Sequence, residues 1–185
     1  MLKADLLRTY KTIKGSKLQK IIGCYRSPGA HAMVIFRFGQ WLRTKNIIIR
    51  LFLEPIYALL YHRIRSKWGI EIPRSAVIGP GLYIGHSGGI IISAGAKIGA
   101  NVNISQQITI GVSGKGDKRG VPIIGDDVYI APGAKIFGKI KVGNNVMIGA
   151  NAVIYKDIPD NAIVVMEPGF KILSFKGNHP VELIK

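Results

Sequence analysis

The sequence predicts a mainly β protein, a coil of short parallel strands with three flat faces, preceded by an α-helical segment. The first observation is an aliphatic residue at every sixth position, thirteen times in all, with a slip of two residues between Ile90 and Ile98 and a longer interruption before Ile124. These positions are Ile72, Ile78, Ile84, Ile90, Ile98, Ile104, Ile110, Ile124, Ile130, Ile136, Val142, Ile148 and Ile154. A helix buries every third or fourth residue and a strand every second, so neither element alone explains a period of six.

The second observation is the type of residue beside these aliphatic positions. Gly follows the aliphatic residue seven times, and Asn or Asp stands at seven nearby positions. These residue types tolerate tight corners and positive φ. Each hexad is therefore expected to form a short strand and a corner, and three hexads, about eighteen residues, to complete one turn of the coil.

We divide the chain into a basic helical segment (residues 1–69), the coil (residues 70–170) and a C-terminal tail (residues 171–185). Residues 1–69 hold 14 Lys and Arg against Asp5 and Glu54, so most of the net charge of +16 belongs there. Breaks at Gly15 and at residues 27–29 separate its helical patterns. Apolar spacing predicts helices over residues 30–45 and 47–67, the second with a kink at Pro55.

Two interpretations of residues 1–69 stay open. The apolar stretch 47–61 is too short to span a bilayer, and Arg50 and Glu54 interrupt it. The helices are expected either to lie on an anionic membrane surface or to pack on the coil and on neighbouring subunits. We expect no nucleic-acid partner, because a basic face without a recognition motif predicts only weak attraction to phosphates.

Composition favours a folded protein that is located in the cytoplasm, with the inner face of the membrane as an alternative localisation. The chain has 185 residues and is 48% apolar, enough for a substantial core. The single Cys24 excludes an internal disulfide framework and fits a reducing compartment. We expect no signal peptide, because charged residues interrupt the first ten positions.

The candidate general base is His86, the one histidine between residues 70 and 170. Imidazole titrates near neutral pH, so it can accept a proton from a hydroxyl group in the transition state. Glu71 precedes it by fifteen residues. Since one turn takes about eighteen residues, we expect Glu71 on the adjacent turn, where its carboxylate would orient the imidazole.

Residues 28–170 resemble the serine acetyltransferase branch of the hexapeptide-repeat acyltransferases. The likeness is carried by Gly69-Ile70-Glu71-Ile72-Pro73, by Ile84-Gly85-His86, by Gly111-Val112-Ser113-Gly114-Lys115 and by Ile148-Gly149-Ala150-Asn151-Ala152-Val153. The segment Pro28-Gly29-Ala30-His31-Ala32 with Arg37 extends it toward the N-terminus. The resemblance implies a left-handed parallel β-helix, acetyl-CoA as co-substrate, His86 and Glu71 as catalytic residues, and a homotrimer with active sites between subunits.

The resemblance also implies the positions that bind the two substrates. Coenzyme A is expected along exposed backbone of the coil and at a lysine; these residues are Gly111, Ser113, Ala131, Pro132, Gly149, Ala150 and Lys156. The acceptor is expected near Gly85, Lys118 and Arg119. Residues 111–122 interrupt the repeat and suit a lid over the substrate. No metal is expected, since one histidine cannot supply a catalytic metal site.

Departures from the family pattern concern the acceptor. Gly85 replaces an Asp that the family carries before the catalytic His, and Lys118-Arg119-Gly120-Val121-Pro122 lacks the family's second His. Ala94 replaces the Glu that partners that second His. Because a charged serine needs oppositely charged partners, we expect a neutral hydroxyl acceptor instead, on a sugar or polysaccharide precursor. The alternatives are a serine O-acetyltransferase and a scaffold without catalytic activity.

Overall fold

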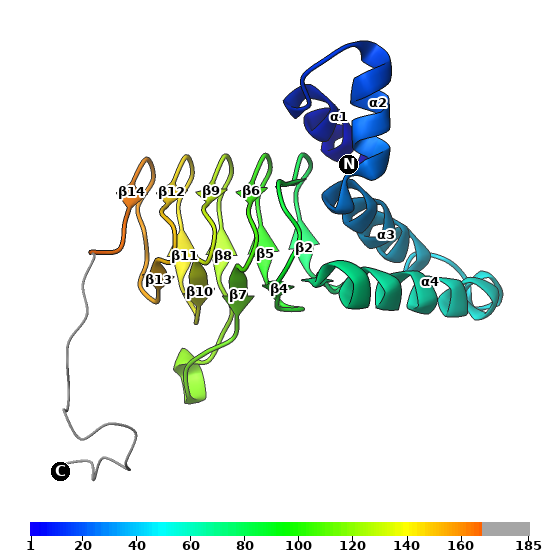
Figure 1. Cartoon of the computed structure of the whole chain (residues 1–185). Helices are drawn as coiled ribbons and strands as arrows, with labels where there is room; N and C mark the ends of the chain where they lie inside the picture. The colour runs from blue at the N-terminus through cyan, green and yellow to red at the C-terminus, as the bar shows by residue number, and fades with distance from the viewer. Residues whose placement is uncertain (168–185) are drawn as a thin grey trace, which may run out of the picture.

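The computed structural model describes residues 1–167, apart from the side chain of Lys118, so the predicted tail lies outside the described residues. The predicted fold is confirmed. A helical segment is followed by a left-handed parallel β-helix, and the helices sit at the end of the coil where it begins (Figure 1).

Four α-helices form the N-terminal segment: α1 (Leu2–Thr12), α2 (Lys17–Arg26), α3 (Pro28–Leu42) and α4 (Ile47–Trp68). The helix α3 begins two residues earlier than predicted because Ser27 caps it and Pro28 fits its first turn. The helix α4 is continuous through Pro55 and ends at Gly69, whose φ of 59° is left-handed.

The coil is built from short strands that stack into three parallel sheets. The first sheet holds β1 (Ile70–Glu71), β4 (Ile90–Ile92), β7 (Thr109–Gly111), β10 (Lys135–Phe137) and β13 (Val153–Ile154). The second holds β2 (Val77–Ile78), β5 (Lys97–Ile98), β8 (Ile123–Ile124) and β11 (Lys141–Val142). The third holds β3 (Tyr83–Ile84), β6 (Asn103–Ile104), β9 (Tyr129–Ile130), β12 (Met147–Ile148) and β14 (Ile163–Val164).

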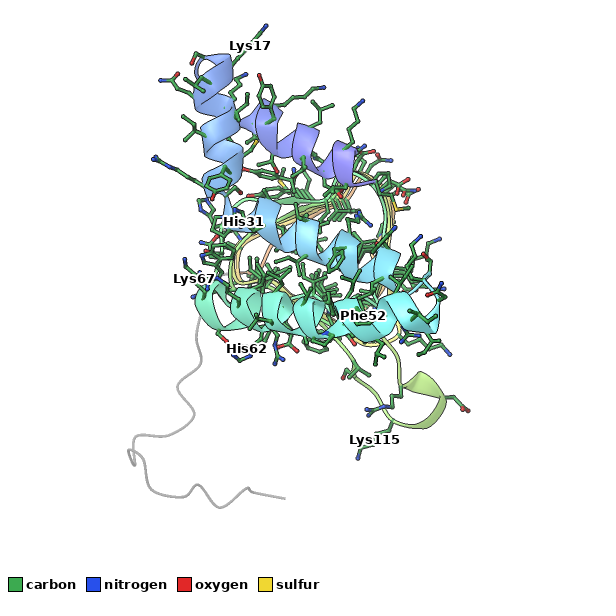
Figure 2. All side chains as sticks on the ribbon, turned by 90° about the vertical axis from the view of Figure 1, so that its right-hand side faces the viewer. Lys17, His31, Phe52, His62, Lys67 and Lys115 are labelled. Carbon is green, nitrogen blue, oxygen red and sulfur yellow. The ribbon has the colours of Figure 1, made fainter. Side chains whose placement is uncertain are left out.

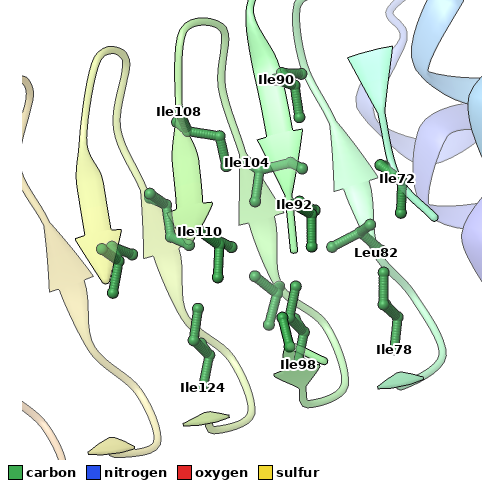
Figure 3. Packing of buried hydrophobic residues seen from close by; sticks show 14 of the residues in the cluster. Ile72, Ile78, Leu82, Ile90, Ile92, Ile98, Ile104, Ile108, Ile110 and Ile124 are labelled. Atoms are coloured by element: carbon green, nitrogen blue, oxygen red, sulfur yellow. The ribbon is translucent and has the colours of Figure 1, made fainter. Parts of the chain in front are cut away.

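All thirteen aliphatic positions of the repeat are buried inside the coil, each at most 4% exposed. Figure 3 shows several of them stacked in columns within the coil. Burial of an Ile side chain stabilises the folded state by about 1.5–3 kcal/mol, so these inward-facing aliphatic residues are the main source of stability of the coil.

The slip in the repeat lies in a different place from the predicted one. Ile70 pairs with Ile90, so the first turn takes twenty residues, and Ile92 rather than Ile90 stacks under Ile110. The two extra residues therefore lie in the corner between Ile84 and Ile92. That corner contains His86.

A buried ion pair fixes the helices to the coil. The carboxylate of Asp5 in α1 accepts hydrogen bonds from Arg37 Nε at 2.9 Å and from the backbone amides of Gly81 and Leu82 at 2.7 and 3.1 Å. Arg37, in α3, also donates to the carbonyls of Ile78 and Gly79. Two helices are thereby hydrogen-bonded to the first turn of the β-helix.

Membrane insertion as a spanning helix finds no support in the described residues. None of their helices has both the length and the apolar character that crossing a bilayer demands.

Candidate active site

His86 lies in the enlarged corner between β3 and β4, and its side chain is exposed. The corner is fixed to the end of α4, because Gly88 N donates to Trp68 O and Ile90 N donates to Gly69 O, both at 2.9 Å. Gly88 and Gly89 have positive φ values of 105° and 68°, which glycine adopts without strain. The insertion thus displays an accessible imidazole on a rigid base.

The α-helical segment also sets the position of this corner. Gly29, near the start of α3, lies so close to β3 that a Cβ atom there would be 2.4 Å from the carbonyl oxygen of Ile84. Glycine is needed at this position for the helix to approach the strand. The residue two positions after Ile84 is His86, so the helix contact and the candidate base are adjacent.

Four of the predicted coenzyme positions share one edge of the coil with His86. Each pair follows a strand of the third sheet: Gly85 and His86 follow β3, Ala131 and Pro132 follow β9, and Gly149 and Ala150 follow β12. Backbone hydrogen bonds from Ala131 N to Ile148 O and from Asn151 N to Pro132 O tie these turns together. With strands about 4.8 Å apart, the four positions lie about 10–14 Å along the edge from the turn of His86.

The remaining predicted coenzyme and acceptor positions lie on another edge. Gly111 ends β7, Lys156 follows β13, and Ser113 and the exposed Arg119 belong to the projecting loop 111–122. The width of the first sheet, roughly 10 Å for its three-residue strands, separates this edge from His86. One chain therefore does not bring the two groups of residues together.

The loop 111–122 forms a cleft on this second edge. Ser113 N donates to Gly120 O at 3.1 Å, and Gly120 N donates to Ser113 O at 3.0 Å. The amide of Ser113, an expected coenzyme position, is therefore already paired within the loop. A cleft of about 490 Å³ lies beside it, lined by Ser113, Asp117, Phe137, Lys139 and Tyr155. The predicted acceptor residue Lys118 has its side chain outside the described residues.

The structure does not place Glu71 on His86. Glu71 pairs in register with Ile91, because the first turn takes twenty residues rather than eighteen. Its carboxylate forms an ion pair with Arg65 at 3.2 Å. Among residues 1–167, neither an ion pair nor a hydrogen bond joins Glu71 to His86. The predicted orienting contact is therefore not formed in the single chain.

Arg65 is a candidate site residue that the sequence did not single out. It lies in the last turn of α4, six residues before Glu71, and the turn at Gly69 brings the two side chains together. The pair lies in a second cleft of about 490 Å³, which Gly89 of the His86 corner also lines. The signal that could have indicated this pair is a helix that ends in basic residues immediately before the first strand.

Tyr61, one turn before Arg65 in α4, responds to the same charges. The pKa of its phenol is raised to about 12; burial is the largest cause, the negative charge of Glu71 contributes to the rise, and Arg65 opposes it. No group of three or more His, Cys, Asp or Glu side chains that could hold a metal ion exists among the described residues.

Comparisons with known proteins identify similar chains. The family described as bacterial transferase hexapeptide (six repeats) matches residues 122–156. The chain is 38% identical over 152 residues to a serine acetyltransferase of Mycobacterium tuberculosis, covering 81% of this chain and 62% of that protein. The chain thus spans about half to three fifths of the length of the curated relatives it matches.

Solved structures agree with these matches. The serine acetyltransferase of Neisseria gonorrhoeae in complex with serine superposes with a TM-score of 0.71 at 30% identity, over 90% of this chain and 66% of that one. A serine acetyltransferase in complex with CoA superposes with a TM-score of 0.71 at 26% identity, with the same coverage.

These comparisons contradict the expectation of a sugar or polysaccharide acceptor and favour serine, the alternative. The expectation was based on charged groups missing from the corner and the loop. It did not count Arg65, which places a cation and an anion together beside the His86 corner.

Proposed function

Since this chain belongs to the serine acetyltransferase-like branch of the hexapeptide-repeat family, we propose that it transfers the acetyl group of acetyl-CoA to the hydroxyl group of serine. The observation that carries the proposal is the shared edge: the exposed imidazole of His86 lies on the same edge as four backbone positions expected to hold the pantetheine arm.

In the proposed reaction, the oxygen of the serine hydroxyl attacks the thioester carbonyl while His86 takes the proton of that hydroxyl. A new C–O bond forms, the C–S bond of the tetrahedral intermediate breaks, and the proton held by His86 passes to the departing thiolate. Cys24 takes no part, because it lies in α2, away from the coil. No covalent acyl-enzyme is required.

The cleft beside this corner has charges that suit a zwitterionic acceptor. Serine carries an ammonium group and a carboxylate, and both need partners when they leave water. Glu71 offers a carboxylate for the ammonium group and Arg65 a guanidinium for the carboxylate. Both side chains are about half exposed, at 41% and 49%, so a substrate can reach them.

We propose a homotrimer in which each active site is completed by a neighbouring coil. Two features of the single chain support this. First, the residues of the two edges lie at opposite ends of the strands of the first sheet. Second, the outer face of that sheet carries Ile91 and Val153, whose side chains are each nearly half exposed. A neighbouring subunit packed there would cover apolar surface and bring a loop 111–122 toward His86.

The cytoplasm remains the proposed localisation of the protein. The single Cys24 is consistent with a reducing compartment.

The test is release of CoA thiol from acetyl-CoA in the presence of L-serine. We expect turnover that His86→Ala lowers by about 10²–10⁴-fold while acetyl-CoA binding, measured by calorimetry, is retained. The matched control is His31→Phe, which keeps an aromatic ring against Trp68 and is expected to retain activity. Absence of both turnover and acetyl-CoA binding would instead support the scaffold alternative.

A further inference from the structure

The turn between α3 and α4 is the part of the helical segment farthest from the β-helix (Figure 1). We call residues 41–52 the hairpin tip. Most of its apolar side chains are exposed: Ile47 is 73%, Leu51 70% and Phe52 71% exposed, and Ile48 and Trp41 are also exposed, whereas Leu42 is buried. Figure 2 shows Phe52 on α4, at the end of the molecule that faces the viewer.

Single apolar residues are exposed on any protein surface, but here several exposed apolar residues lie close together. In α4, Ile47 and Leu51 are four residues apart, as are Ile48 and Phe52, so these four exposed side chains lie next to one another on the helix. Contiguous apolar surface of this kind usually marks contact with a membrane or another protein.

The charges around the tip select between these occupants. Arg43, Lys45 and Arg50 lie within it, and Lys45 Nζ is 4.7 Å from the centre of the Trp41 ring. The one acidic residue between positions 38 and 56 is Glu54, which pairs with Arg74 at 2.8 Å and with Arg50 at 3.4 Å. The tip thus presents cations beside aliphatic and aromatic side chains.

We propose that the hairpin tip docks on an anionic phospholipid surface. Apolar side chains would enter the boundary between headgroups and acyl chains, Trp41 would lie at headgroup level, and the cations would reach the lipid phosphates. A second copy of the chain fits less well, since it would bring like charges together. This proposal is independent of the acetyl transfer proposed above.

The first measurement uses the unaltered full chain. Sedimentation with vesicles of phosphatidylglycerol and phosphatidylcholine should show binding that is reduced by high salt and is weak with phosphatidylcholine alone. Trp41 should give a blue shift of fluorescence on binding that Trp41→Phe abolishes. Failure to sediment with anionic vesicles at low salt would overturn the proposal.

The second measurement uses variants. Phe52→Gln should lower the vesicle partition coefficient by roughly tenfold or more, because burial of a phenylalanine side chain is lost. The matched control is Ile163→Gln, which changes a residue of 72% exposure at the far end of the coil. For the charges, Arg43→Gln should weaken binding and Lys97→Gln, on the second sheet, should not.

The outcomes are distinguishable. Equal binding of Phe52→Gln and Ile163→Gln would overturn the proposal. So would a change of oligomeric state in Phe52→Gln, measured by light scattering, without a change in vesicle binding, since that would make the tip an interface between copies. Because Phe52 is exposed, thermal unfolding of the variant should match that of the unaltered chain.

Discussion

Asp5 and Arg37 are 32 residues apart in the chain, and their side chains, 0% and 6% exposed, meet in an ion pair at 2.9 Å beneath the first turn of the coil. The donors to the carboxylate of Asp5 come from both α3 and the coil. The helical segment is therefore attached through a buried charge, whose removal leaves Arg37 without its counter-ion.

Asp5→Ala should destabilise the protein by about 3–5 kcal/mol, because it leaves the guanidinium of Arg37 buried and uncompensated. Urea unfolding followed by circular dichroism measures this change. The control Asp117→Ala removes an exposed carboxylate from the loop and should change stability by less than about 0.5 kcal/mol. Similar effects of the two changes would show that the buried pair is not what attaches the helices.

Arg65→Gln should raise the KM for serine by roughly tenfold to a hundredfold with little change in kcat, since a charge-assisted hydrogen bond to the carboxylate is lost. Steady-state kinetics with varied serine measures the effect. Arg63→Gln, which removes an exposed cation from the same helix, is the matched control. An unchanged KM in Arg65→Gln would place the acceptor elsewhere, without affecting the assignment of His86.

Glu71→Gln should lower the pKa of Tyr61 from about 12, since the charge of Glu71 contributes to the rise. It should not restore the ordinary value, because burial is the larger cause. Tyrosinate absorbance, compared with a Tyr61→Phe variant, isolates this phenol from the other tyrosines. An unaltered titration would mean that Glu71 and Tyr61 are not neighbours in solution.

Acid unfolding should report on Glu54, which joins α4 to the coil. A hydrogen bond from Arg74 holds the pKa of Glu54 below its ordinary value, and Arg50 adds to this. The folded state therefore binds the proton less readily than the unfolded state, so this contribution to stability is present above the unfolded pKa and is lost as pH falls through the folded pKa. Glu54→Gln should flatten stability over that acidic range.

Urea unfolding at a series of acidic pH values checks this prediction. In an Arg74→Gln background, Glu54→Gln should have a smaller effect, because the main cause of the lowered pKa is already absent. An equal effect in both backgrounds would rule out Arg74 as that cause.

The periodic part of the molecule could be predicted from the sequence, and its junctions could not. The inward column was predicted because each of its residues fills the same kind of site on every turn. The slip was misplaced because Ile90, Ile91 and Ile92 are consecutive, so an aliphatic residue is available at either phase. Only the pairing of Ile92 with Ile110 decides between them.

The candidate site shows the same division. The repeat assigns His86 and the edge positions to their corners, whereas the coenzyme role of the edge positions was implied by the family resemblance. The position of Glu71 relative to His86 could not be predicted from the repeat, because it depends on the length of one irregular turn. The contact between Arg65 and Glu71 depends on the direction in which α4 enters the coil at Gly69, and no repeat encodes that direction.

The regular stacking of β9 on β12 fixes the spacing between successive turns of the coil. Ile130 pairs with Ile148, so excision of residues 131–148 would join equivalent points of successive turns and preserve the pattern of every remaining rung. The excision would remove Ala131 and Pro132, and it would shorten the distance along the edge from the His86 corner to Gly149 by about 4.8 Å. We therefore expect a whole-turn deletion to change how far the proposed coenzyme-binding positions lie from His86 while the fold is preserved.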